Sequence, residues 1–195
     1  IRRQRQMCIR DRLGFEYKYK PDNWLNNVVV EYIYSKYQSG PIYHDHTITV
    51  PDHIGGKDNY YNHYIFPGYQ HWGQAMGNPL YRSPIYNEDG TIYFKDNRFI
   101  AFHLGLGGHP TDCLKWRFLA TWQEGLGTYE KPYTHKKHNV SLLGETSYMF
   151  NKSETSNWLR GTEVKLGIGA DFGGILEGPN YGLQLTLSKR GLLNK

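Results

Sequence analysis

The chain has 195 residues, of which 38% are hydrophobic and 15% aromatic, with 17 Tyr and 22 Gly. This length allows one domain with a sizeable core, and the composition suits a many-stranded sheet. No run of about 18 apolar residues occurs, which excludes a transmembrane helix. The two cysteines, Cys8 and Cys113, exclude a disulfide framework. The net charge of +5 is concentrated in residues 1–12, which hold five arginines and one acid.

Residues 1–12 read IRRQRQMCIRDR, and Met7–Arg12 resembles translated sequencing-adapter read-through. We therefore treat this tail as non-native and leave it out of the fold prediction. A nucleic-acid or anionic-lipid arm is the alternative, but no apolar face or aromatic interleaving accompanies the arginines. Residues 13–195 are expected to be the near-neutral C-terminal part of a longer protein with an upstream signal peptide, and no nucleic-acid partner is expected.

Seven segments place apolar residues at every second position, which is the pattern of strands with one apolar face. In 163–172, for example, Val164 and Leu166 alternate with Glu163 and Lys165. The pattern predicts an all-β, antiparallel fold. In chain order the segments are 13–20, 28–38, 98–107, 115–126, 139–150, 163–172 and 181–190.

Three features favour a transmembrane β-barrel over a β-sandwich. Most segments are 10–12 residues long, which suits a tilted spanning strand better than the usual strand of about 5–6. The connections alternate between modest turns (21–27, 108–114, 151–162) and a class that contains loop 39–97 together with 127–138 and 173–180, as periplasmic turns and external loops do. Aromatic residues lie at the ends of the apolar faces, where barrels have girdles: Trp116, Trp122, Tyr148, Phe150, Phe172 and Tyr181.

Seven is an odd number of strands, whereas single-chain bacterial barrels have an even number. We therefore expect about seven strands of a larger barrel. Loop 39–97 is long for a compact domain, and such loops are usually functional. Within it, Tyr69–Met76 is expected to form a short helix, and Asn87–Gly90 is expected to be the turn of a hairpin. Cys113 lies in a predicted turn and is interpreted as incidental.

Three chemistries are open to loop 39–97. A metal site would use His44, Asp45, His46 and His53, but their spacing is irregular and no cysteine joins them. Catalysis would use a pair among Asp52, Asp58, Glu88 and Asp89, but nothing singles out a pair. We therefore expect no enzyme, metal or cofactor. Carbohydrate contact fits best, because aromatic rings stack on sugars and polar groups bond hydroxyls. The alternative is that these side chains only pack the loop against the wall of the predicted barrel. The candidates are Tyr60, Tyr61, His63, Tyr64, Gln70, His71, Trp72 and Arg82.

Four stretches of the chain resemble the capsule assembly protein family Wzi in its Bacteroidetes form: Asn59–Tyr64, Gly68–Pro84, Trp122–Tyr129 and Asn180–Lys189. The resemblance covers about residues 13–193. It implies an outer-membrane β-barrel, monomeric when full length, that contacts outer-membrane lipid and anchors capsular or surface polysaccharide in a lectin-like role. Family members have more strands than this chain offers, which agrees with a C-terminal fragment. The alternatives are an outer-membrane channel or transporter and a soluble β-sandwich carbohydrate-binding module.

Overall fold

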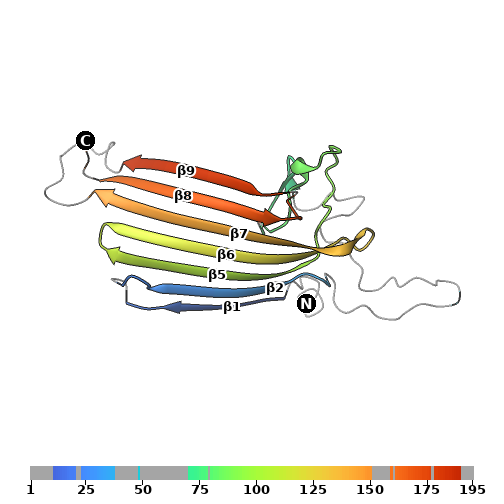
Figure 1. The fold of residues 1–195 in the computed structure, drawn as a ribbon, viewed down its shortest axis with the longest axis horizontal. Coiled ribbons are helices and arrows are strands. Elements are labelled where there is room, and N and C mark those ends of the chain that lie inside the picture. Colours follow the sequence, from blue (N-terminus) through green and yellow to red (C-terminus); the bar gives the residue numbers. More distant parts are fainter. Residues whose placement is uncertain are drawn as a thin grey trace, which may run out of the picture.

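The computed structural model describes residues 11–20, 23–37, 48, 70–78, 80–150, 159, 161–176 and 178–189. Seven antiparallel strands form one sheet in the order β1-β2-β5-β6-β7-β8-β9, so each strand pairs with the next long strand along the chain (Figure 1). The strands are β1 (Asp11–Lys18), β2 (Asn27–Tyr34), β5 (Phe99–Thr111), β6 (Leu114–Gly127), β7 (Pro132–Phe150), β8 (Thr162–Gly173) and β9 (Asn180–Lys189).

The prediction of an all-β, antiparallel sheet is confirmed, because each of the seven predicted segments coincides with one of these strands. Within the described residues there is no helix long and apolar enough to cross a membrane. β1 begins at Asp11, so residues 11 and 12 of the N-terminal tail belong to the sheet. β1 and β9 are the two edges, and the described part of the chain shows no pairing between them. The sheet is thus open there, and the transmembrane barrel stays a prediction.

Strand β7 is longer than the predicted segment 139–150, and its length changes the loop pattern. It begins at Pro132, which lies opposite Gly127 of β6. Residues 133–138 are polar on both faces of the strand, so alternation does not reveal them. The predicted loop 127–138 is therefore wrong, because only the short turn 128–131 separates β6 from β7. The difference in length between the two classes of loop now depends on loop 39–97 alone.

The predicted hairpin around Asn87–Gly90 is also wrong. A 3-10 helix, η1 (Pro84–Tyr86), and a turn occupy this stretch. The buried side chain of Asn87 donates to the carbonyls of Thr91 at 2.9 Å and Tyr93 at 2.8 Å. These carbonyls are therefore satisfied by a side chain rather than by a neighbouring strand.

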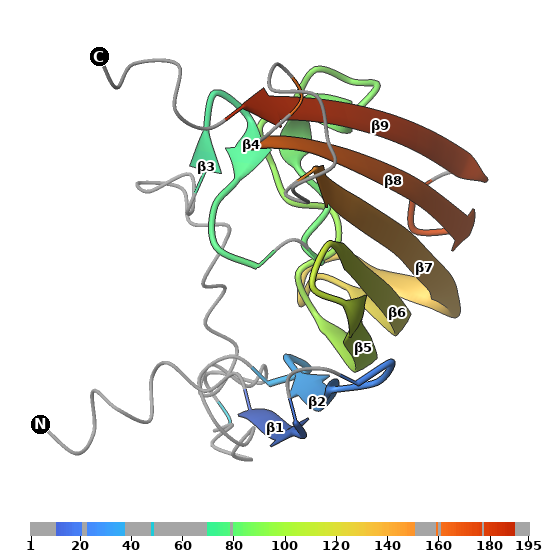
Figure 2. The same cartoon turned by 90° about the vertical axis from the view of Figure 1, so that its left-hand side faces the viewer.

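The two faces of the sheet differ in chemistry. Figure 2 shows a curved sheet with residues 70–97 on its concave side. The convex face carries the apolar half of each strand, and those side chains stay exposed, for example Leu183 at 75% and Ile168 at 57%. The sheet is thus inverted relative to one in a water-soluble protein, in which the apolar face is covered. A small apolar core lies on the concave side and consists of Ile33, Tyr81, Phe94, Phe99 and Ala101.

Gly108 in β5 lies where the turn between β1 and β2 folds back onto the sheet. Trp116 Nε1 donates to the Trp24 carbonyl at 2.7 Å, and the two rings lie 4.9 Å apart. A Cβ on Gly108 would overlap the Trp24 carbonyl, which is fixed backbone. We expect Gly108→Ala to lower the free energy of unfolding by about 1–3 kcal/mol, measured as a shift in the urea midpoint. Gly144→Ala is the control, because its new Cβ would meet nothing within 4 Å. Equal urea midpoints for the two variants would contradict the close packing at Gly108.

Candidate functional site

The segment between β2 and β5 contains a two-residue hairpin with a tryptophan at its tip. Strands β3 (Gln70–His71) and β4 (Gln74–Ala75) pair with each other and leave Trp72 and Gly73 as the turn. Both turn residues have positive φ, 52° and 75°, as in a type I′ turn. The predicted helix over residues 69–76 is wrong, because a right-handed helix requires negative φ throughout.

Trp72 occupies this position at a cost that its packing does not offset. The left-handed region is unfavourable by about 1–2 kcal/mol for a residue with a bulky side chain, and Asn-Gly is the usual type I′ pair. The Trp72 side chain is 85% exposed, and its ring meets the His71 ring edge-on at 6.0 Å. A strained, exposed aromatic residue is typical of a binding site rather than of a core.

The other predicted contact residues have different environments. Gln70 Nε2 donates to the Ile92 carbonyl at 2.7 Å, and Arg82 Nη2 donates to the Tyr86 carbonyl at 2.7 Å. Both side chains therefore hold the backbone of their own segment. The structure thus brings His71 and Trp72 together at the tip and leaves Gln70 at the base of the hairpin. The remaining candidates lie outside the described residues: Tyr60, Tyr61, His63 and Tyr64.

A buried carboxyl group joins the end of this segment to the sheet. Asp96 is 2% exposed, and its Oδ1 accepts a hydrogen bond from Gly127 N at 3.0 Å. Its Oδ2 is buried without a hydrogen-bond partner among the described residues. Burial raises the pKa of Asp96 to about 7, although backbone N–H groups, chiefly of Gly127 and Leu126, and the charge of Lys137 act to lower it.

Two further side chains fasten the segment. Arg98 Nε donates to the Lys36 carbonyl at 3.0 Å, and its Nη1 donates to the Thr128 carbonyl at 3.2 Å. On the other side of the segment, Gln123 Nε2 of β6 donates to the Leu80 carbonyl at 3.1 Å. The segment is therefore held to the concave face at Leu80 and at its C-terminal end by buried or half-buried polar contacts.

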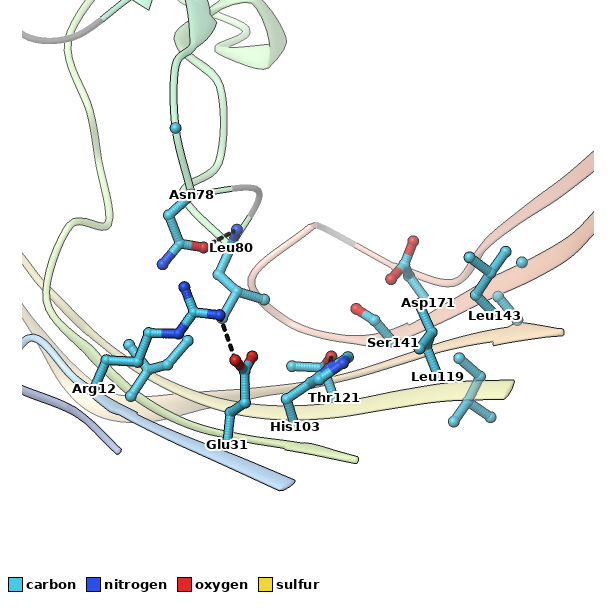
Figure 3. Close-up of a pocket in the computed structure, with 15 residues that line it drawn as sticks. Arg12, Glu31, Asn78, Leu80, His103, Leu119, Thr121, Ser141, Leu143 and Asp171 are labelled. Carbon is cyan, nitrogen blue, oxygen red and sulfur yellow. Dashed lines mark hydrogen bonds and ion pairs between the residues drawn. The ribbon is translucent and has the colours of Figure 1, made fainter. Parts of the chain in front are cut away.

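A cavity of about 770 Å³ lies between this segment and the concave face of the sheet. Figure 3 shows Asn78 and Leu80 on one side, facing side chains that project from the strands. The strand side chains labelled there include Glu31, His103 and Asp171. None of Gln70, His71, Trp72 and Arg82 lines this cavity. The hairpin tip and the cavity are thus two separate candidate sites.

The described residues do not form the metal site or the pair of catalytic carboxylates that were considered for loop 39–97. His44, Asp45, His46, His53, Asp52 and Asp58 lie outside the described residues. Asp89 is in an exposed turn, where hydrogen bonds from Thr91 lower its pKa to about 2, and it pairs with Lys95 at 3.2 Å. Among the residues that the structure describes, no three His, Cys, Asp or Glu gather in a way that would hold a metal ion. Cys113 is buried in the turn 112–113 between β5 and β6, which is shorter than the predicted turn 108–114 because β5 continues to Thr111.

No family model matches this chain, and neither a curated protein nor a solved structure matches it. The resemblance to the capsule assembly family therefore stays a prediction from the sequence.

Sequence reasoning missed Asp96 and the residues of the cavity. Alternation places Glu31, His103 and Asp171 on the polar face, but only the register of the strands aligns them with one another. The signal at Asp96 is weaker still, because an acid next to Asn97 and Arg98 looks like part of an exposed turn.

Proposed function

We propose that this chain is part of an outer-membrane β-barrel that binds capsular polysaccharide and anchors it at the bacterial cell surface, without catalysing a reaction. The exposed apolar convex face carries the proposal. Apolar side chains point outward from all seven strands, whereas polar and charged side chains share the concave face with the 70–97 segment. An apolar outside and a polar inside are the pattern of outer-membrane barrels.

Aromatic side chains support the membrane placement, because they gather near both ends of the convex face. At one end Tyr148 packs on Phe150 at 4.9 Å between centroids, and at the other Phe172 packs on Tyr181 at 5.7 Å. At about 3.3 Å per residue, the stretch of β7 from Val140 to Phe150 extends roughly 33 Å. A tilt of about 40° reduces this to roughly 25 Å, the height of the apolar band in such barrels.

The position of the 70–97 segment favours anchoring over transport. It lies against the polar face that would line the lumen, and Asp96, Arg98 and Gln123 fasten it there. A loop folded into the lumen obstructs a channel. A soluble β-sandwich module would need a second sheet over the convex face, and no such layer is present among the described residues.

The hairpin tip supports the carbohydrate part of the proposal. An exposed indole offers a flat apolar surface on which the C–H face of a sugar ring can stack, and an imidazole beside it can bond a hydroxyl. Trp72 keeps this exposure despite an unfavourable backbone conformation. The resemblance to the capsule assembly family points to the same ligand class.

Replacing Trp72 by Asn separates binding from folding. Asn tolerates positive φ, so the hairpin is expected to become more stable by about 1 kcal/mol while it loses the ring. We expect less capsule to stay on the cells, measured as cell-bound against released polysaccharide. Ile92→Asn is the control, because it removes an exposed apolar side chain of the same segment that has no aromatic ring. Unchanged capsule retention in Trp72→Asn, with normal amounts of protein in the membrane, would remove the tip from the mechanism.

Membrane placement has its own test. The protein extracted in detergent is expected to migrate differently on gels before and after heating, as folded outer-membrane barrels do. A protein that stays soluble without detergent would overturn the proposal.

A further inference from the structure

One row of polar side chains crosses five neighbouring strands on the concave face. Because neighbouring strands lie about 4.8 Å apart, the row presents hydrogen-bonding groups at that spacing over roughly 19 Å. All five residues line the cavity of about 770 Å³, and Figure 3 shows them projecting into the same space. In the register of the sheet each one lies directly opposite the next: Glu31, His103, Thr121, Ser141 and Asp171.

A second row lies beside the first and is aliphatic. Leu119 lies opposite Leu143, which lies opposite Gly169, and all three line the cavity. A sugar ring carries hydroxyl groups around its edge and C–H groups on its faces, so it needs polar and apolar surface side by side. The volume falls within the range of about 300–1,000 Å³ that is typical of small-molecule sites.

The polar row still has hydrogen-bonding capacity to offer a ligand. His103 Nδ1 and Thr121 Oγ1 share a hydrogen bond of 2.7 Å. Ser141 Oγ accepts a hydrogen bond from Asn139 Nδ2 at 3.1 Å, so its own hydroxyl hydrogen can be donated to a ligand. The hydroxyl groups of Thr121 and Ser141 can thus form a hydrogen bond with a sugar while a neighbouring side chain holds them in place.

The charge of the cavity restricts which sugars fit. Asp171 has no cationic partner among the described residues, and the cation that pairs with Glu31 is Arg12, which belongs to the N-terminal tail. Among its described lining residues the cavity therefore holds at least one unbalanced carboxylate, that of Asp171. A uronic acid or another anionic sugar would meet like charge in a partly enclosed space, which is unfavourable. A hydroxyl or a protonated amine would instead donate to Asp171.

From this combination we infer that the cavity is a saccharide subsite for neutral or amino-bearing sugars, separate from the Trp72 tip. The inference depends on the proposed polysaccharide binding and names the sugar class that one part of the protein takes.

Isothermal titration of the detergent-extracted protein with three trimers tests the inference. The probes are the glucosamine trimer, which is cationic, its N-acetylated form, which is neutral, and the galacturonic acid trimer, which is anionic. We expect the cationic trimer to bind most tightly, since a hydrogen bond between two charged groups contributes about tenfold in affinity. We expect the anionic trimer to bind at least about tenfold more weakly than the neutral one, since its carboxylate would meet the like charge of Asp171.

Asp171→Asn keeps the shape of the side chain and removes its charge. We expect this variant to lose the preference for the cationic trimer, with a loss of about tenfold in affinity, and to bind the neutral trimer nearly unchanged. Asp112→Asn is the control, because Asp112 is exposed in the turn between β5 and β6 and does not line the cavity. Ser141→Trp, which would fill the cavity, is expected to abolish binding of all three trimers.

Three results would overturn the subsite: equal binding of the anionic and neutral trimers, an unchanged ranking in Asp171→Asn, or no binding of any trimer. Failure of the subsite is distinguishable from failure of the proposed function. Loss of cell-bound capsule in Trp72→Asn together with absent trimer binding would reject the cavity alone. A protein soluble without detergent would reject the membrane anchor instead.

Discussion

Ile168→Arg is expected to make the free energy of assembly into a membrane less favourable by roughly 2–4 kcal/mol, because a lipid-facing convex face would place the cation near the bilayer midplane. Ile168 lies in the middle of β8 on the convex face and is 57% exposed. In a water-soluble protein the same change at an exposed position would stay within about 0.5 kcal/mol. The substitution therefore reports which solvent the convex face meets.

The measurement is the fraction of heat-modifiable, folded protein after refolding into phospholipid vesicles over a series of urea concentrations. Gln184→Arg is the control, because Gln184 is also exposed but lies on the concave face of the neighbouring strand, opposite Gly167. We expect Gln184→Arg to assemble like the unaltered protein. Equal assembly of both arginine variants would contradict a lipid-facing convex surface.

The attachment of the 70–97 segment is expected to weaken as the pH rises, because of Asp96. Its pKa is raised by burial from 3.8 to about 7, so the folded protein binds this proton more tightly than the unfolded chain does. The stabilisation is fully present below pH 3.8 and is lost as the pH rises through about 7. The raised pKa corresponds to about 4 kcal/mol. Asp96→Asn keeps an acceptor for Gly127 N and stays neutral, so it is expected to remove the pH dependence.

Amide hydrogen exchange at Gly127 measures this effect. Comparing the unaltered protein with Asp96→Asn at the same pH cancels the intrinsic pH dependence of exchange. At pH 5 we expect the unaltered protein to exchange about tenfold faster than Asp96→Asn, and at pH 8 up to roughly a thousandfold faster. Asp89→Asn is the control, because hydrogen bonds to Thr91 hold the pKa of Asp89 at about 2, below both measurements. A rate ratio that is the same at pH 5 and pH 8 would contradict the role of Asp96.

Much of the sheet is predictable from the sequence because alternation is a local signal. The faces of β8, with Val164 and Leu166 on one side and Glu163 and Lys165 on the other, follow from a period of two alone. Where the period fails, the prediction fails too. The first residues of β7 are polar on both faces, and they belong to a strand because they pair with the end of β6.

The residues of the candidate sites are less predictable, because their positions depend on strand register and on the sign of the backbone angle φ. Neither the row from Glu31 to Asp171 nor the burial of Asp96 has a local signature, since both arise from residues far apart in the chain. At the hairpin tip, Trp-Gly takes a conformation that Asn-Gly usually takes. Sequence propensity therefore favoured a helix over the observed hairpin around Trp72. The residue itself was already a candidate for sugar contact.

The pairing of β2 with β5 has a consequence for how such a protein can diversify. Tyr34 lies opposite Ile100, so the chain leaves the sheet after β2 and returns beside its point of departure. The long segment between these strands is topologically a hairpin loop, however much structure it contains. Its length and composition can change without shifting the register of a single strand. The segment can therefore vary from one descendant protein to another while the sheet that holds it stays the same.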